Sequence, residues 1–289
     1  ERRTRQVMWL TAAMMVVEIA AGTIFNSMAL LADGWHMSSH ALALGVSAVA
    51  YALALRMAHD PRFAFGTWKI EVLGGYTSAV FLMGVAAYMG IESITRLVTP
   101  SAIRFDEAIP VAVLGLVVNV VSAWLLSTGD TGHHHDRPGH HHGHDHHDLN
   151  LRSAYLHVVA DAVTSILAIA ALIGGKYLGA AWLDPVMGLV GTLLVGRWAW
   201  GLLRDTGRVL LDAEMDAPIV EEVREVVRGL PQPTTVRDLH LWRVGKGKYA
   251  CILSLSTGAA LDADAVRRAL SVHEELVHVT VELLHVTPR

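Results

Sequence analysis

The stretch ALLADGWHMSSHALALGVSAVAYALAL, residues Ala29–Leu55, decides what kind of fold this chain has. It is long and apolar enough to cross the ~30 Å hydrocarbon core of a bilayer as one helix. It nevertheless carries Asp33, His36 and His40. Ionisable side chains at that depth are costly unless they face a cavity, a pathway or a partner. The stretch therefore predicts a membrane helix with a functional polar face.

Further apolar stretches of similar length lie on both sides of it, and a polar segment ends the chain. The other predicted spans are Val7–Phe25, Ile70–Ile94, Ala108–Ser127, Leu151–Ile173 and Trp182–Leu203. After about Asp205, patterns of period 3.6 and period 2 predict helix, strand, strand, helix and strand. These elements are Ala217–Arg228, Val236–Trp242, Tyr249–Ser256, Asp262–His273 and His278–His285. The prediction is an α-helical membrane protein with six transmembrane helices in residues 1–204 and a small cytoplasmic α+β domain (αββαβ) in residues 205–289.

Composition excludes several other classes of protein. Of the 289 residues, 53% are hydrophobic and 17% charged, whereas soluble chains carry about 25% charged residues. The net charge of −4, with no long basic patch, argues against nucleic acid as a partner. The single cysteine, Cys251, excludes an internal disulfide and a cysteine-only metal cage.

The distribution of Lys and Arg predicts the orientation in the membrane, because basic residues accumulate in short cytoplasmic loops. An even number of spans places both termini on one side. That side holds Arg2, Arg3, Arg5, Arg56, Arg62, Lys69, Arg137, Arg152, Arg204 and Arg208. The other side holds Arg96, Arg104 and Lys176. Both termini are therefore expected to be cytoplasmic, in an integral protein of a bacterial inner (plasma) membrane.

Two pairs of polar residues predict a metal site inside the membrane. His36 and His40 lie four residues apart in the second span, and His157 and Asp161 lie four apart in the fifth. Each pair falls on one face of a helix. Facing one another, the pairs offer three imidazoles and one carboxylate, a donor set that suits a tetrahedral first-row divalent metal. The alternative is pore-facing polar residues that form helix–helix hydrogen bonds. Asp33 is expected at an outer mouth or in a helix cap.

With these residues the chain resembles the cation diffusion facilitator family. The four candidate ligands match the family's metal site position for position. Other matching segments are Ser27-Met-Ala-Leu-Leu-Ala-Asp33, Leu183-Asp-Pro185, the histidine loop and Asp238-Leu-His-Leu-Trp242. The resemblance implies a six-span homodimeric exporter that exchanges a cytoplasmic divalent cation for protons, with a ferredoxin-like tail. The metal ion is the substrate, and no cofactor and no enzymatic activity are expected.

One departure from the family pattern concerns the transported ion. Zinc members commonly have Asp where this chain has His40, and His-Met-Ser-Ser-His resembles the cobalt- and nickel-exporting DmeF-like branch. The resemblance therefore implies a preference for Co²⁺ and Ni²⁺. Ligand softness does not separate these ions from Zn²⁺. A Zn²⁺ exporter, or a broad Zn²⁺/Fe²⁺/Cd²⁺ exporter, stays as the alternative.

Auxiliary metal sites are expected to be weaker. In the loop after the second span, Phe63 and Thr67 stand where the family has histidines, so a site built on Asp60 and His59 is expected to be absent or weak. In the tail, the candidate ligands are His240, His278 and His285, and lone strand histidines are more often structural. A loop with nine imidazoles is predicted to be disordered without metal and to capture or sense metal ions. Its histidines are His133, His134, His135, His140, His141, His142, His144, His146 and His147.

The predicted mechanism is proton antiport. Imidazole has a reference pKa of about 6.5, so protons can displace a metal bound to histidine. Glu18, deep in the first span, is a candidate proton relay or else an interhelical hydrogen-bond partner. An intramembrane zinc protease is disfavoured, because Met37 occupies the position of the glutamate base in His-Glu-x-x-His. A membrane metal sensor or buffer that acts through the histidine loop is the remaining alternative.

Overall fold

The structure is a computed structural model that describes residues 2–127, 145–258 and 261–285. For residues 2–8, 39–41, 43–44, 123–127 and 145–161 it describes the backbone alone. The chain divides into two compact units, one formed by residues 1–44 and 80–200 and the other by residues 45–79 and 201–289.

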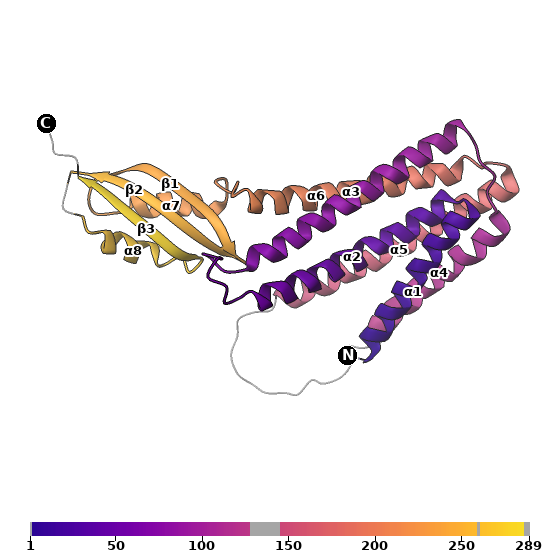
Figure 1. Ribbon diagram of the computed structural model, residues 1–289, viewed down its shortest axis with the longest axis horizontal. Helices are drawn as coiled ribbons and strands as arrows, with labels where there is room; N and C mark the ends of the chain where they lie inside the picture. Colours follow the sequence, from indigo (N-terminus) through magenta and orange to yellow (C-terminus); the bar gives the residue numbers. More distant parts are fainter. Residues whose placement is uncertain (1, 128–144, 259–260, 286–289) are drawn as a thin grey trace. The chain divides into compact units, whose positions relative to one another are not determined.

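All six predicted apolar stretches are helices (Figure 1). Their bounds are α1 Arg2–Phe25, α2 Met28–Arg56, α3 Trp68–Val98, α4 Phe105–Ser127, α5 Asp145–Leu178 and α6 Leu183–Leu210. Each continues beyond the predicted apolar stretch at one or both ends. Backbone hydrogen bonding carries a helix past the hydrocarbon boundary into polar residues such as Arg56.

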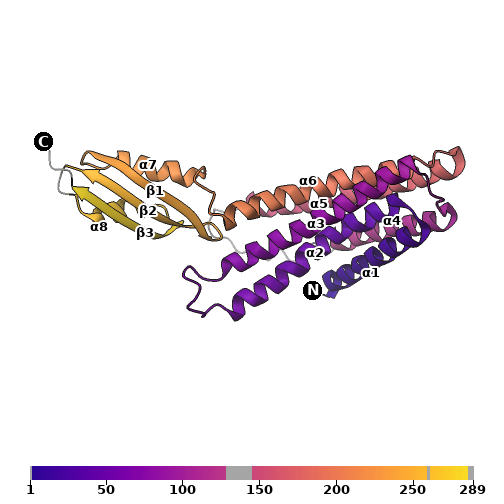
Figure 2. The ribbon, with the colours of Figure 1, turned by 45° about the horizontal axis from the view of Figure 1, so that its top comes forward.

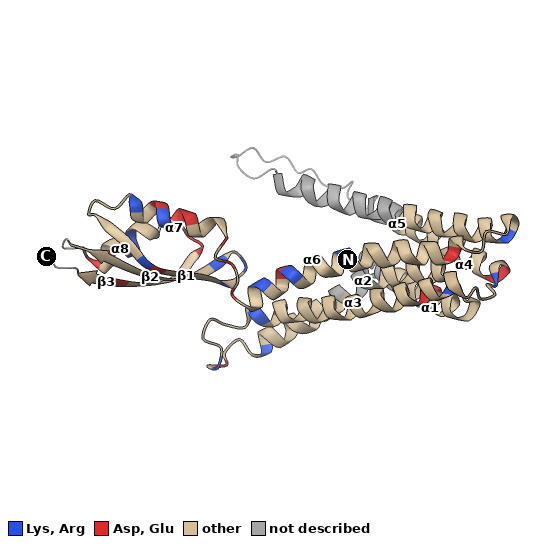
Figure 3. Ribbon diagram, turned by 90° about the horizontal axis from the view of Figure 1, so that it is seen from above, with Lys and Arg blue, Asp and Glu red and all other residues tan. Residues whose placement is uncertain are grey.

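Three of these helices are long and apolar enough, over their described residues, to cross a membrane. They are Trp68–Val98, Phe105–Ser122 and Leu183–Leu210. The other three contain shorter apolar helical stretches within the same described residues: Trp9–Phe25, Gly45–Arg56 and Ala162–Leu178. In the described parts of α1 to α6, charged residues are sparse along the middles of the helices and more frequent near their ends (Figure 3). Length and composition therefore support a membrane domain, and the number of six spans stays a prediction.

Small residues let the helices of the first unit approach closely. Helix α4 packs against both α1 and α5, and Figure 2 shows these helices side by side. A Cβ on Gly22 would lie 2.8 Å from the Leu31 side chain, and a Cβ on Gly34 would lie 2.9 Å from Ile19. A Cβ on Gly115 would overlap the Glu18 carboxylate. Close approach at small residues is how membrane helices gain packing energy without a hydrophobic driving force between them.

The C-terminal elements follow the predicted order. They are α7 Pro218–Arg228, β1 Thr234–Gly245, β2 Lys248–Thr257, α8 Ala263–Leu270 and β3 Leu276–His285. The sheet order is β1-β2-β3, with β1 and β2 antiparallel and β2 and β3 parallel. Gly247, at φ +63°, makes the tight turn between β1 and β2. The apolar sides of α7 and α8 bury Val223 and Leu270 against Leu241 and Leu253 of the sheet.

The second unit also contains the loop between α2 and α3. The Phe65 ring meets the Trp242 ring edge-on, with centroids 5.8 Å apart, and lies 5.5 Å from the His278 ring. The Lys69 ammonium pairs with the Asp212 carboxylate at 2.7 Å. These contacts join the α2–α3 loop to the C-terminal elements.

Candidate metal site

The candidate site involves helices α2 and α5. His36 of α2 is half-buried and lines a small pocket together with Asp33. His40 is also a residue of α2, and His157 and Asp161 are residues of α5. The side chains of these three residues lie outside those the structure describes, so their convergence on one metal ion stays a prediction.

Most of the pocket wall beside His36 is made of small or apolar side chains. Its lining residues are Ala29, Ala32, Asp33, His36, Thr164, Ala168, Met187, Val190, Gly191 and Leu194. They come from α2, α5 and α6. A Cβ on Gly191 would lie 2.7 Å from the Cβ of Ala32, so this wall is closely packed. The polar atoms of Asp33, His36 and Thr164 thus face a pocket that is otherwise apolar.

Asp33 lies inside helix α2, so the prediction of a helix cap was wrong, and its place at an outer mouth stays a prediction. The helix already begins at Met28, and the Asp33 side chain is only 4% exposed. Ser165 Oγ donates to Asp33 Oδ2 at 2.7 Å, and Thr164 Oγ1 donates to Oδ1 at 3.3 Å. Two hydroxyl groups of α5 therefore bind this carboxylate, which would otherwise be costly to bury.

Sequence reasoning did not identify Ser165, Thr164 or Asn119. Asn119 of α4 donates to Ser165 Oγ at 3.5 Å, so a polar chain connects α2, α5 and α4. These residues carry the same signal that singled out the histidines, a polar side chain within an apolar span. Neutral hydroxyl and amide groups are common enough in membrane helices that the signal alone does not select them.

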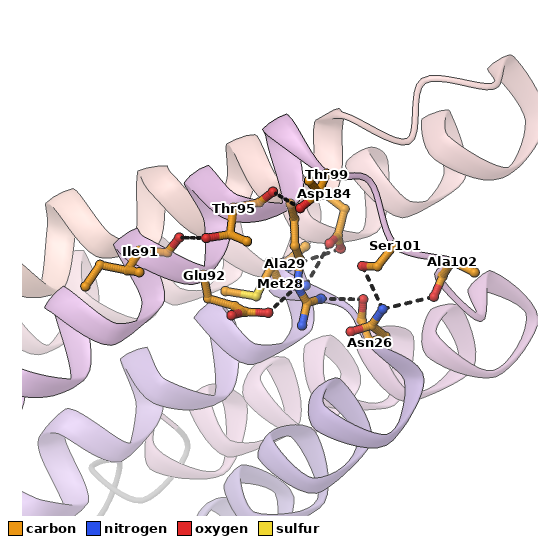
Figure 4. A network of polar contacts seen from close by, with 11 residues as sticks. Asn26, Met28, Ala29, Ile91, Glu92, Thr95, Thr99, Ser101, Ala102 and Asp184 are labelled. Atoms are coloured by element: carbon orange, nitrogen blue, oxygen red, sulfur yellow. Dashed lines mark hydrogen bonds and ion pairs between the residues drawn. The ribbon is translucent and has the colours of Figure 1, made fainter.

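The first turn of α2 is capped by a carboxylate from α6. Asp184 accepts hydrogen bonds from Ser27 Oγ at 2.6 Å, from the Met28 N–H at 2.7 Å and from the Ala29 N–H at 3.1 Å. Figure 4 shows this cap beside the contacts of Asn26. These bonds satisfy backbone donors that a helix start leaves unpaired, and they fix where the candidate metal helix begins.

Arg96 of α3 stabilises the same turn from a second side. Its Nη1 donates to the Asn26 carbonyl at 2.6 Å, and its Nε pairs with Glu92 at 2.9 Å. The Asn26 side chain in turn donates to Ser101 Oγ at 2.8 Å. The start of α2 is therefore bound to α3, to the α3–α4 loop and to α6.

Glu18 is fully buried in α1, at 0% exposure. Within the described residues, neither of its carboxylate oxygens has a hydrogen-bond partner. The predicted alternative of an interhelical hydrogen bond is therefore not found among these residues. A carboxyl group in such surroundings is costly to bury, which singles Glu18 out among the residues of α1.

The predicted auxiliary sites differ in what surrounds them. In the loop, the Arg62 guanidinium and backbone N–H bind Asp60 and lower the pKa of its carboxyl group. In the tail, His240 Nε2 lies 3.0 Å from Asp238 Oδ2, His278 stacks edge-on with Phe65, and His285 is exposed at the end of β3. No group of three or more His, Cys, Asp or Glu residues that could hold a metal occurs in the part of the chain that was described.

The histidine loop lies outside the described side chains. This concerns His133, His134, His135, His140, His141, His142, His144, His146 and His147. Its predicted role in metal capture therefore stays a prediction.

Comparison with known proteins identifies the family. The family model described as the cation efflux transmembrane domain matches residues 7–211 of the chain. The chain belongs to the cation efflux family. This cation efflux protein is 32% identical over 279 residues to the zinc transporter ZitB of Pectobacterium atrosepticum, a match that covers 95% of the chain and 82% of ZitB.

Two further relatives have names that mention metal transport. The cation efflux system protein CzcD of Alcaligenes sp. strain CT14 is 29% identical over 291 residues, which cover 98% of this chain and 86% of CzcD. The cadmium, cobalt and zinc/H(+)-K(+) antiporter of Bacillus subtilis is 28% identical over 280 residues, covering 93% and 84%. This cation efflux protein is therefore a membrane transporter of divalent metal cations.

Proposed function

We propose that this cation efflux protein exports Co²⁺ and Ni²⁺ in exchange for protons, through a site formed by His36, His40, His157 and Asp161. The observation that carries the proposal is the contact between Asp33 of α2 and Thr164 and Ser165 of α5. It fixes a register between the two helices one turn away from the candidate ligands.

The register argument follows from helix geometry. Figure 1 shows α5 running in the opposite direction to α2, so α5 residue numbers fall as α2 numbers rise. Ala29 and Ala168 line the same pocket as Asp33 and Thr164, as this arrangement requires. His36 lies three residues after Asp33, and Asp161 lies three residues before Thr164. His40 lies seven residues after Asp33, and His157 lies seven residues before Thr164. Steps of three and seven stay on one helix face, so continuing the register pairs His36 with Asp161 and His40 with His157.

The preference for Co²⁺ and Ni²⁺ is supported by His40. An imidazole in place of a carboxylate removes a negative charge and a hard oxygen ligand, which favours metals that accept a nitrogen-rich shell. The names of the relatives mention zinc, cadmium and cobalt. A Zn²⁺ exporter, or a broad Zn²⁺/Fe²⁺/Cd²⁺ exporter, is therefore the second candidate.

The proton step uses two kinds of group. Protonation of the three histidine ligands competes with metal binding, so protons that enter from the far side release the metal there. Glu18 is the candidate relay, because its buried carboxyl group has no hydrogen-bond partner among the described residues. Rocking of the helices around the site supplies alternating access.

The proposed architecture has six spans in residues 1–204 and a ferredoxin-like cytoplasmic domain in residues 205–289. The αββαβ order supports the tail, and the six long helices support the spans. The excess of basic residues on one side supports a cytoplasmic location for both termini, in a bacterial cell. The working unit is a homodimer in the inner membrane. The histidine loop captures metal for the transport site, with His240 and His285 as auxiliary ligands.

The test is metal flux into proteoliposomes under an imposed pH gradient, with Co²⁺, Ni²⁺ and Zn²⁺ compared. We expect His36→Ala to abolish flux and His40→Asp to shift preference toward Zn²⁺. His273→Ala is the matched control, since His273 pairs with Glu222 in the tail at 3.2 Å. Flux that ignores the pH gradient contradicts the antiport, and flux that survives His36→Ala contradicts the site. If no metal moves at all, the sensor or buffer alternative replaces the exporter.

A further inference from the structure

We propose that Asp33, with Ser165 and Thr164, is a positioning device that holds the two halves of the metal site at bonding distance. The inference rests on the proposed function, because it assumes that the pairs on α2 and α5 share one metal ion. Asp33 itself is not assigned as a ligand. It acts through the position of α5 relative to α2.

The geometry of the hydrogen bonds carries the proposal. Asp33 is 4% exposed and Ser165 is 1% exposed, so water does not compete for their 2.7 Å contact. Each carboxylate oxygen accepts from a different α5 hydroxyl, Oδ1 from Thr164 and Oδ2 from Ser165. A carboxylate bound through both oxygens to adjacent residues of one helix resists both sliding and rotation of that helix.

The short, strict lengths of metal–ligand bonds make a fixed position of α5 relative to α2 necessary. Metal–nitrogen and metal–oxygen bonds near 2.0–2.2 Å tolerate errors of only about 0.2 Å. Sliding α5 by a single residue would shift its ligands by about 1.5 Å and turn them by about 100°. A contact one helical turn from the ligands is close enough to prevent this movement, and it leaves the ligands themselves free to exchange metal and protons.

The surroundings of the contact fit the same role. Ala29, Ala32 and Ala168 line the pocket beside the contact, and small side chains let membrane helices pack closely. Asn119 donates to Ser165 Oγ at 3.5 Å and so connects the device to α4. Helix α4 also packs on α1, so the α5 end of the contact has a fixed support.

The experiment measures Co²⁺ flux against Co²⁺ concentration in proteoliposomes for four variants of the full chain. These are Ser165→Ala, Asp33→Asn, the double variant of both, and Ser122→Ala. Ser122 is the matched control, because it is a buried serine of α4 whose hydroxyl has no hydrogen-bond partner among the described residues. Melting temperature in detergent without metal is recorded for each variant.

We expect Ser165→Ala and Asp33→Asn each to raise KM by about 10- to 100-fold, the range found when groups that orient metal ligands are removed. The double variant should be no worse than either single variant, because both changes break one contact. Ser122→Ala should keep the KM of the parent protein.

Three results would overturn the proposal. A lower melting temperature with an unchanged KM shows a purely structural contact. Loss of all flux in Asp33→Asn with normal flux in Ser165→Ala shows that Asp33 is itself a ligand. Additive effects in the double variant show two independent roles. His36→Ala distinguishes a failure of this proposal from a failure of the proposed function. Unchanged flux in that variant would show that the proposed transport site is wrong.

Discussion

At the scale of single residues, two buried carboxylates of the first unit have different surroundings. Asp33 accepts hydrogen bonds from two hydroxyl groups of α5, whereas Glu18 has no hydrogen-bond partner among the described residues. The sequence predicted Glu18 deep in its span, and in the structure its side chain is fully buried. It did not predict the hydrogen bonds of Asp33, because a pattern along one helix does not say which neighbouring helix supplies hydroxyl groups. Ser165 and Thr164 are found only by knowing that α5 packs there, and that knowledge requires the tertiary structure.

Gly115 offers a sharp test of the packing around Glu18. A Cβ at position 115 would overlap the Glu18 carboxylate, so Gly115→Ala forces that side chain or α4 to move. We expect a loss of about 1–3 kcal/mol of stability, the usual cost of overpacking. Gly84→Ala is the control, because among the described residues no atom beyond its chain neighbours and its own helix backbone lies within 4 Å of a Cβ there. Thermal unfolding in detergent compares the two, and equal melting temperatures would contradict the packing described.

Cys251 allows a clean chemical test of the tail. Its side chain is 0% exposed, and burial raises the pKa of the thiol to about 11. Because the thiolate is the reactive form, the folded protein should resist a maleimide at pH 7.5 and react only after denaturation. The chain has no other cysteine, so any labelling reports on this position. Rapid labelling of the native protein would show that the β2 core opens readily.

At the scale of elements, the polar tail was easier to predict than the membrane helices. Helices α7 and α8 each have one apolar and one charged side, so the side that faces the sheet is visible in the sequence. Helices such as α4 are apolar on nearly every side, and the pattern does not distinguish the lipid-facing side from the packed side. Their existence was predicted correctly, but their rotation was not predictable.

The core of the tail should respond strongly to a lost side chain. Leu253 of β2 is fully buried between α7, α8 and the sheet, whereas Leu284 of β3 is 45% exposed. Leu253→Ala is expected to cost about 2–5 kcal/mol, as is typical for a buried leucine, and Leu284→Ala much less. Unfolding of the full chain in detergent, followed by circular dichroism, measures both. Similar costs at the two positions would contradict the one-sided core.

The Asp184 cap at the start of α2 is expected to contribute to the stability of the protein. Asp184→Asn keeps the size of the side chain but removes the charge that faces the helix start and one acceptor oxygen. We expect a loss of about 1–3 kcal/mol, since a buried N–H or hydroxyl is left unpaired. Asp106→Asn is the control, because Asp106 is 78% exposed where it pairs with Lys176. Equal stability of the two variants would show that the cap contributes little.

At the scale of the whole molecule, the distribution of polarity is that of a protein in lipid. Large apolar side chains such as Ile91 and Leu193 are 68% and 72% exposed, whereas Asp33 and Glu18 are buried. Exposed apolar surface on this scale needs a hydrocarbon solvent. The composition already predicted this solvent. The pairing of helices was not predictable, because any two apolar surfaces are nearly equivalent in energy in lipid.

Substituting two leucines of similar exposure tests which part of the surface faces lipid and which faces water. Leu193 lies in the middle of α6, and Leu211, 80% exposed, lies just after its end. Leu193→Lys should cost about 2.5–3.5 kcal/mol of insertion energy, whereas Leu211→Lys should be tolerated. The yield of protein in the membrane fraction measures this difference. If both variants insert equally well, residue 193 does not face hydrocarbon.

The cap on α2 also sets an order of events during synthesis. Met28 and the Asp184 that binds its N–H are separated by 156 positions along the chain. At about 5–20 residues per second, a ribosome needs roughly 8–30 s to make that interval. Throughout that time the backbone N–H groups of Met28 and Ala29 lack the acceptor that they have in the finished protein. A chain cut short before α6 therefore lacks the hydrogen bonds that fix where α2 begins.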